Sequence, residues 1–580
     1  MRNNIRVNTL LVIVAIVTLW SCKRVYEEIP LGQQIPLDIA FDPNDSAGRN
    51  AMKFLLTTYV ECLPDNHNRI FGNYLDAASD DAVSSQSGLS EVQKIVTGAY
   101  TSVSTNADNV WSKYYTGIRD ATVFSVYINR VPMNEKLPNG SLARPAYRSE
   151  ARFLRAFLYF ELLKRYGGVP LLGDSIRQLG DNIQIPRSSF ADCVNYIVSE
   201  CNNIKDSLRT QEMVTPATYG RITKGAAMAL KAKVLLYAAS PLYNGGNIDG
   251  SNPLTGYPSF DANRWKLAAD AAKELMDLGT YDLNPSFSDV FTNQAATVGN
   301  NKESIFWRQN GINISVEINN GPVGYTSAGG AGVTSPTQNL VDAFTTDEGK
   351  AITDPTSGYN PNNPYAHRDP RLSKTVFYNG VLWLNRAVET YEGGLDRPGG
   401  TVQQTKTGYY MRKFMGPFES VSGPAVYTGT VHDFIYFRYS EVLLNYIEAL
   451  NEFSGPSTDI YNILYKIRTR AGILPGADNS YGVPAGLSKE DMRTLIRNER
   501  RTELAFEEHR FFDIRRWKIA DQVFASPLRG MGIQRSSGGT LVFNPINVLT
   551  PVFRNPQMYF YPIPYNEVIK NPQMIQNPQW

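Results

Sequence analysis

The sequence predicts a mainly α fold, in which paired helices are joined to a loop-rich region with a few short strands. Segments with helical periodicity and clear start and stop signals recur over most of the 580 residues. Between about residues 281 and 433 these signals give way to loops rich in Gly, Pro, Asn and Thr. Small residues at helical spacing on several of the expected helices would let their axes approach closely.

The N-terminus is expected to be an export signal that is not part of the fold. An apolar run at residues 10–19 follows a basic start and is too short to span a bilayer. It leads into the sequence LWSC, which resembles a bacterial lipobox although its tryptophan departs from the usual small residue. We expect residues 1–21 to be a lipoprotein signal peptide and Cys22 to be lipidated; an ordinary cleaved signal is the alternative. Residues 22–44, which contain three prolines, should form the lipid anchor and an extended tether.

Helices are expected in two blocks, at about residues 45–280 and 434–520. The best-defined helix, residues 145–166, starts with a proline, ends before two glycines and is apolar around most of its circumference. It should therefore lie buried between neighbours. The other predicted helices are residues 46–62, 110–131, 189–208, 223–239, 262–278, 436–452 and 457–470. Their small and aromatic residues suggest tetratricopeptide-like packing, although no fixed repeat period is present.

The region from about 281 to 433 is expected to be irregular. Short strands are predicted at residues 304–307 and 375–378, separated by long loops such as 318–336. Loops of this length without secondary structure of their own tend to be functional or disordered. Residues 521–580 follow as a C-terminal segment.

The stretch from residue 487 to 518 has the densest charge pattern. A capping box of Ser488 and Asp491 should begin a helix whose apolar stripe, which extends to Phe506, contains Glu499 and Glu503. Carboxylates in that position must be paired or must raise their pKa. We expect a structural ion network with arginines of the same stretch, formed by Glu499, Arg500, Glu503, Arg510 and Arg515. A catalytic carboxylate pair is the disfavoured alternative, because so many guanidiniums would keep both acids ionised.

Charge and motifs exclude several other classes. The 57 basic and 55 acidic residues nearly cancel, which argues against a nucleic-acid binder. No hydrolase, zinc-protease or nucleotide-binding motif is complete, and the four histidines show no metal spacing. After Cys22 the chain has Cys62, Cys193 and Cys201, which are expected to be buried and unpaired. We therefore expect no catalytic residue, no metal and no cofactor.

Six segments resemble one known family. The stretch RNERRTELAFEEHRFFDIRRWK is similar to the C-terminal signature of the SusD/RagB family, which comprises nutrient-binding outer-membrane lipoproteins of Bacteroidetes. The others are EARFLRAFLYFELLKRYGGVPLL, PTQNLVDAF, RDPRL, FRYSEVLLNYIEAL and YPIPYNEVIKNPQMIQNPQW, in the expected order. The resemblance implies one SusD-like domain at residues 45–580, with a scaffold of four tetratricopeptide-like helix pairs. It also implies that the irregular region helps to form the ligand surface.

The resemblance further implies a function. We expect a lipid-anchored outer-membrane protein, facing the cell exterior, that binds an oligosaccharide and passes it to a SusC-type TonB-dependent transporter. No covalent chemistry is expected. Three alternatives stay open: an oligopeptide ligand, as in the RagB branch; a glycoside hydrolase, which would need a carboxylate pair with one raised pKa; and a helical scaffold whose only partner is another protein.

A sugar site requires an exposed aromatic ring in a loop, flanked by amide or carboxylate groups. By that criterion the candidate ligand-binding residues are Tyr74, Tyr100, Tyr325, Tyr378 and Trp383. The family's site geometry favours Tyr100 and Tyr325 among them. Asp80 and Asp81 follow Tyr74 in a polar loop, where turn and cap duty is favoured over hydrogen bonding to sugar hydroxyls. Trp111 and Trp307 lie in patterns typical of core residues.

Overall fold

A computed structural model describes residues 36–580 except 179, 183, 247, 293–300, 326–327 and 400–403. The predicted signal peptide and the lipidation site, Cys22, lie outside the described residues. The prediction of an extended tether is wrong for its last part, because residues 37–40 form helix α2 (Leu37–Ala40). The next residue, Phe41, is buried, with its ring centroid 5.4 Å from that of Phe54 and 5.9 Å from that of Phe124. Residues 37–41 therefore belong to the folded domain.

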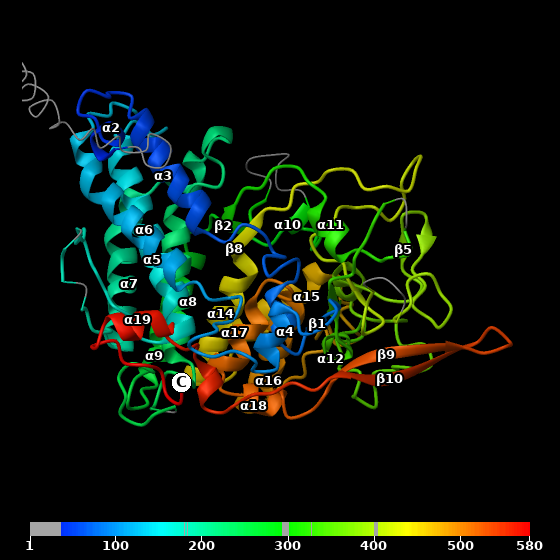
Figure 1. The fold of residues 1–580 in the computed structure, drawn as a ribbon. Coiled ribbons are helices and arrows are strands. Elements are labelled where there is room, and N and C mark those ends of the chain that lie inside the picture. Colours follow the sequence, from blue (N-terminus) through cyan, green and yellow to red (C-terminus); the bar gives the residue numbers. More distant parts are fainter. Residues whose placement is uncertain are drawn as a thin grey trace, which may run out of the picture.

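The first block of helices forms a layered array at one side of the molecule (Figure 1). Successive helices pack in chain order, α5 against α6, α6 against α7, α7 against α8 and α8 against α9. The helices of this array are α3 (Arg49–Cys62), α5 (Trp111–Tyr127), α6 (Ala143–Tyr166), α7 (Phe190–Ile204), α8 (Lys224–Ala239) and α9 (Asn263–Met276). The short helix α4 (Glu91–Val96) lies apart from them and packs against the 3-10 helix η1 (Leu75–Ala78). Each of the helices predicted in this block is present, with bounds shifted by a few residues.

The sequence of helix α6 explains both its burial and the point at which it ends. Nineteen of its residues are buried, in keeping with apolar side chains around most of its circumference. It ends at Gly167, which has φ 74°. A side chain at that position would collide with the carbonyl oxygen of Leu254. The glycine therefore both ends the helix and allows the next segment to pass close by.

The second block extends the array through α14, which packs against both α9 and α8. Its helices are α14 (Tyr439–Ser454), α15 (Thr458–Ala471), α16 (Lys489–Glu503), α17 (His509–Arg516), α18 (Ala520–Val523) and α19 (Tyr565–Lys570). Two predictions are corrected here. Residues 436–438 belong to strand β8 (Phe434–Arg438) and not to the following helix. The apolar stripe to Phe506 is also broken, because α16 ends at Glu503 and Phe506 has φ 63°.

The region between the blocks is irregular, as predicted. Its helices are short: α10 (Asp289–Thr292), α11 (Ser315–Asn320), α12 (Gln338–Ala343) and α13 (Pro370–Thr375). Every sheet in the described part of the chain has two strands. The antiparallel pairs are β1 (Ala82–Ser84) with β3 (Thr334–Pro336), β2 (Ser304–Arg308) with β8, β4 (Val376–Phe377) with β7 (Tyr410–Met411), and β5 (Leu382–Trp383) with β6 (Arg386–Ala387). The strands predicted at 304–307 and 375–378 correspond to β2 and β4.

A long hairpin in the C-terminal segment projects from the body of the molecule (Figure 1). It consists of β9 (Leu528–Arg535) and β10 (Leu541–Leu549), paired antiparallel with Leu541 opposite Arg535. This hairpin was not predicted from the sequence. Among the described residues, no helix is both long and apolar enough to cross a bilayer.

Candidate functional site

The aromatic residues predicted to form a sugar platform are mostly buried. Tyr74, Tyr100, Tyr325 and Trp383 expose 5% of their surface or less, so the exposure that we expected of them is wrong. Tyr378 is half-buried and stacks on Tyr365 at 4.3 Å between ring centroids. The structure does not bring the five rings together.

Each buried ring has a packing partner that explains its burial. Tyr74 lies between Phe414, at 5.9 Å, and Phe506, at 5.8 Å between ring centroids. The guanidinium of Arg386 lies 3.8 Å from the ring centroid of Tyr325. The indole N–H of Trp383 donates to the Tyr427 hydroxyl at 3.2 Å, inside a cluster with Phe377 and Phe418. The aromatic residues that we expected to be exposed in these loops instead pack into aromatic clusters beneath the loops.

Asp80 and Asp81 are also buried. Their side chains fit neither of the roles considered for them, which were capping the next helix and hydrogen bonding to sugar hydroxyls. Arg510 donates to both carboxylate oxygens of Asp80, at 2.8 and 2.9 Å, and Arg501 bonds both aspartates. Burial alone would raise the pKa of Asp80, but Arg501 and Arg510 outweigh it and lower the pKa to about 2. The two side chains neither cap the next helix nor reach solvent. They tie the segment after η1 (Leu75–Ala78) to α16 and α17.

The ion network around Glu499 and Glu503 is present and buried. Its arginines come from other elements and not from the same stretch: Arg371 Nη1 lies 2.8 Å from Glu499 and 2.9 Å from Glu503. Arg468 pairs with Glu499, and Arg438 and Arg470 pair with Glu503. Burial opposes ionisation, yet these cations hold the pKa of both glutamates below the usual range. Two acids that are both ionised cannot divide general acid and base roles.

The arginines predicted for this network have separate partners. Arg500 Nε lies 2.6 Å from Asp513, and its Nη2 donates to Nδ1 of His509 at 3.2 Å. Arg515 is the exception. Within the described chain no carboxylate lies at ion-pair distance from it, and its guanidinium lies 3.6 Å from the ring centroid of Phe511, one helical turn earlier. Arg515 therefore does not belong to the ion network, contrary to the prediction.

Phe71 meets the exposure criterion that the predicted residues fail, as does Phe260 in another loop. Phe71 is 69% exposed, although it lies one residue before Gly72 and three before the buried Tyr74. Ile70 and Asn73 bond each other's backbone on either side of it, so Phe71 and Gly72 form the tip of a two-residue turn. Both have positive φ, 51° and 86°, as in a type I′ turn.

The conformation of Phe71 is unfavourable for its residue type. Type I′ turns favour Asn, Asp or Gly at the first central position, because a larger side chain with positive φ meets the backbone. An aromatic residue held there costs on the order of 1–3 kcal/mol, and such strain clusters at functional sites. The turn therefore displays an apolar ring to solvent at the expense of stability.

The segment that carries this turn is bonded to two others, and we call all three together the Phe71 surface: residues 63–73, 309–320 and 424–433. The Asn310 side chain donates to the backbone carbonyls of Asp65 at 2.7 Å and His432 at 2.8 Å, which joins all three. The backbones of Asn313 and Thr430 bond each other at 2.9 and 3.0 Å. Asn320 Nδ2 lies 3.5 Å from the Gly72 carbonyl oxygen. The surface is thus held by main-chain contacts and not by flexible side chains alone.

The amide of Gln86 lies beside the turn that carries the ring. Gln86 donates to the Phe71 carbonyl at 2.9 Å and accepts from Asn73 at 3.0 Å. Ile312, on the second segment, is 74% exposed. An exposed ring with an amide group close to its turn is an arrangement that suits a sugar-binding surface. Phe71 was not among the residues predicted from the sequence, although an aromatic residue before Gly-Asn in a loop was a usable signal.

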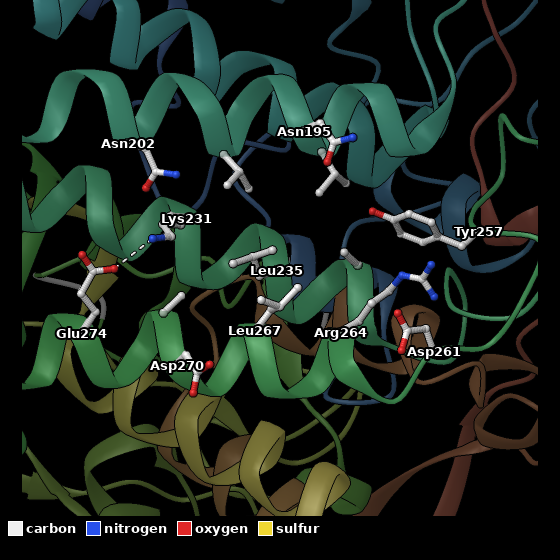
Figure 2. Close-up of a pocket in the computed structure, with 14 residues that line it drawn as sticks. Asn195, Asn202, Lys231, Leu235, Tyr257, Asp261, Arg264, Leu267, Asp270 and Glu274 are labelled. Carbon is white, nitrogen blue, oxygen red and sulfur yellow. Dashed lines mark hydrogen bonds and ion pairs between the residues drawn. The ribbon is translucent and has the colours of Figure 1, made fainter.

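A cavity between helices differs in character from the Phe71 surface (Figure 2). It has a volume of about 470 Å³ and lies between α7, α8 and α9. Its one aromatic residue, Tyr257, has the guanidinium of Arg264 at 3.7 Å from its ring centroid, so that face is covered. Lys231 pairs with Glu274 at 2.9 Å at the other end. The one aromatic ring of this cavity is therefore not free on both faces.

Metal and thiol chemistry have no support in the described residues. These contain no group of His, Cys, Asp and Glu side chains that could hold a metal ion. Cys62, Cys193 and Cys201 are buried and free, as predicted, and burial raises the pKa of all three thiols.

Comparisons with known proteins agree on one family. A model described as the SusD family matches residues 290–580, and one described as starch-binding, associating with the outer membrane, matches residues 45–236. One SusD-like protein of Formosa agariphila is 24% identical over 443 residues, 74% of this chain and 73% of the relative. Another from the same organism is 24% identical over 578 residues, 98% of each chain. The crystal structure of a SusD-like protein from Bacteroides fragilis, 27% identical, has a TM-score of 0.73 and covers 94% of this chain and 100% of that chain.

Proposed function

Because the chain belongs to the SusD family, we propose that it is a glycan-binding lipoprotein of the outer membrane that captures an oligosaccharide on the Phe71 surface. The family description of starch binding in association with the outer membrane supports both the ligand class and the location. The observation that carries the site is Phe71 itself, a strained and 69% exposed ring at the tip of a turn.

The chemistry of the site fits capture without reaction. Sugars present C–H faces to aromatic rings and hydroxyls to amides, and the Phe71 surface offers both. The buried carboxylates Glu499 and Glu503 are held ionised by arginines, which opposes a role in glycoside hydrolysis. The proposal therefore includes no catalytic residue and no cofactor.

The proposal extends to anchoring and delivery. Lipidation at Cys22 would tether the protein to the membrane, and the captured glycan would pass to a SusC-type TonB-dependent transporter with the protein facing the cell exterior. The lipobox-like sequence before Cys22 supports the anchor. Family membership supports the transporter as the partner.

The test compares two exposed phenylalanines. Affinity electrophoresis of the protein without residues 1–22 against a polysaccharide panel should show retardation by at least one glycan. Phe71→Ala should abolish that retardation, whereas Phe260→Ala should not, because Phe260 is a similarly exposed ring (65%) in the loop before α9. Retardation that survives Phe71→Ala would reject this site. The absence of retardation by any glycan would reject the ligand class and favour peptides.

A further inference from the structure

A lysine without an acidic partner lies next to the turn that carries Phe71. Lys406 Nζ donates to the backbone carbonyl of Gln86 at 3.2 Å, and the side chain of Gln86 donates to the Phe71 carbonyl at 2.9 Å. The backbone N–H of Lys406 donates to the hydroxyl of Ser335, on β3, at 3.2 Å. Strand β3 pairs with β1, which ends two residues before Gln86. Hydrogen bonds to two neighbouring segments therefore fix the position of the lysine relative to the turn.

The ammonium group of Lys406 has no counter-ion and an incomplete set of hydrogen bonds. Within the described chain no carboxylate lies at ion-pair distance from it, and the Gln86 carbonyl accepts from one of its three N–H groups. The residue is half-buried, and burial lowers the pKa of its amine with no neighbouring charge to oppose the effect. Withdrawing an ammonium from water costs free energy, so such groups are normally paired. An anion bound beside Phe71 would supply the missing charge.

Two more cations lie where the first segment of the Phe71 surface begins. Arg308 Nη1 and Lys113 Nζ contact the same carbonyl oxygen, that of Leu63, at 3.0 and 3.5 Å, and neither has a carboxylate at ion-pair distance among the described residues. Leu63 is the C-cap of α3, where the helix dipole corresponds to about half a negative charge, against two full positive charges. Asp65 is the exposed acid of the three segments and lies beyond ion-pair distance of both cations. Unpaired positive charge therefore exceeds unpaired negative charge around this surface.

We propose that the glycan bound on the Phe71 surface is anionic, and that Lys406 binds its charged substituent, a carboxylate or a sulfate ester. This inference rests on the proposed function, because it names the class of glycan that the same surface takes. The ring of Phe71 would hold an apolar face of the sugar while the ammonium pairs with the charge beside it. Arg308 and Lys113 would add longer-range attraction, which salt screens over about 8–10 Å.

Oligosaccharide pairs that differ only in charge test the proposal. One pair is an oligogalacturonate and its methyl ester, and the other is a sulfated galactan oligosaccharide and its desulfated form. Isothermal titration calorimetry with the protein lacking residues 1–22 should show at least one anionic member binding roughly tenfold more tightly than its neutral partner in low salt. High salt should reduce the difference. The pair that shows the difference distinguishes a carboxylate from a sulfate ester.

Three variants assign the preference to one side chain. Lys406→Met keeps the length of the side chain but removes its charge, so it should abolish the preference and change the affinity for the neutral partner by less than about twofold. Lys406→Arg should retain the preference. Lys570→Met is the matched control and should behave as the wild type. Lys570 is an exposed lysine on α19 with no carboxylate at ion-pair distance in the described chain, and α19 lies well apart from α11 of the Phe71 surface in Figure 1.

Equal affinities within both pairs would overturn this inference and leave the proposed glycan surface intact. A preference that survives Lys406→Met, or that Lys570→Met removes to the same extent, would overturn it as well. Failure of the proposed function would look different, because either no glycan would bind or Phe71→Ala would leave the binding of both members unchanged. Thermal unfolding identifies a variant that does not fold, and the wild-type affinities at low and high salt decide the question without any variant.

Discussion

Arg510 donates two parallel hydrogen bonds to Asp80, from Nε to Oδ1 at 2.8 Å and from Nη2 to Oδ2 at 2.9 Å, although the residues are 430 positions apart. The pair joins the loop after the first helices to the charged C-terminal stretch. Bidentate pairs of this kind fix orientation as well as position. The loop that carries Phe71 leads directly into η1 and Asp80, so this contact connects the ligand surface to the helical scaffold.

The Asp80 pair makes a specific prediction for acid. A carboxyl whose pKa is lowered on folding stabilises the protein above its unfolded pKa, near 4, and this stability is lost as the pH falls toward the folded pKa, here about 2. The difference corresponds to about 2 kcal/mol. Asp80→Asn should therefore be less stable at neutral pH and should lose less stability between about pH 4 and pH 2. Urea unfolding across this range measures both effects.

The exposed Asp38, in α2, provides the control. Asp38→Asn should follow the wild-type pH curve. If Asp80→Asn also followed that curve in parallel, the ion pair would not be the source of the acid sensitivity.

The Glu499–Glu503 network predicts a large cost for removing one charge. Glu503→Gln leaves Arg371, Arg438 and Arg470 facing a neutral group in a buried site, which should cost about 3–5 kcal/mol of unfolding free energy. Glu490→Gln changes an exposed acid of the same helix, 3.7 Å from Arg493, and should cost about 0–1 kcal/mol. Chemical denaturation of both variants tests the contrast. Equal stability of the two would show that the network contributes little.

The helical part of this fold was predictable because its signals are local. Start and stop residues such as Gly167 and the periodicity of α6 depend only on neighbouring sequence. The ion network was predictable in kind, since buried carboxylates need partners. Its true partners were not, because Arg371, Arg438 and Arg468 lie in other elements and only the fold brings them to Glu499 and Glu503.

The ligand surface was less predictable, for a geometric reason. Aromatic residues in loops look alike in sequence, whether they face solvent or a neighbouring segment. Phe71 and Tyr74 lie three residues apart in one polar loop, yet the type I′-like turn directs the first outward and the second into the core. The long-range contacts that bury Tyr74, with Phe414 and Phe506, carry no local signal.

Substitution of Trp383 should lower the stability of the protein, as expected for a core residue. It is fully buried, and its ring centroid lies 4.7 Å from that of Phe377. Trp383→Ala should cost about 3–5 kcal/mol of unfolding free energy through loss of packing and a cavity. Trp383→Phe, which keeps an aromatic ring, should cost less. Thermal and urea unfolding measure the loss, and near-wild-type stability of the alanine variant would contradict the packing described here.

The turn at Phe71 predicts that stability and binding change in opposite directions. Asn is favoured at the first central position of a type I′ turn, particularly before Gly, so Phe71→Asn should relieve the strain at φ 51°. The expected gain is up to about 1 kcal/mol of unfolding free energy, because little apolar contact is lost from a ring that is 69% exposed. Glycan retardation in affinity electrophoresis should nevertheless disappear.

Phe71→Tyr, which keeps both the ring and the strain, should retain binding without the gain in stability. A loss of stability in Phe71→Asn would show that the ring is held by packing, and retained binding would show that the turn is not a glycan platform.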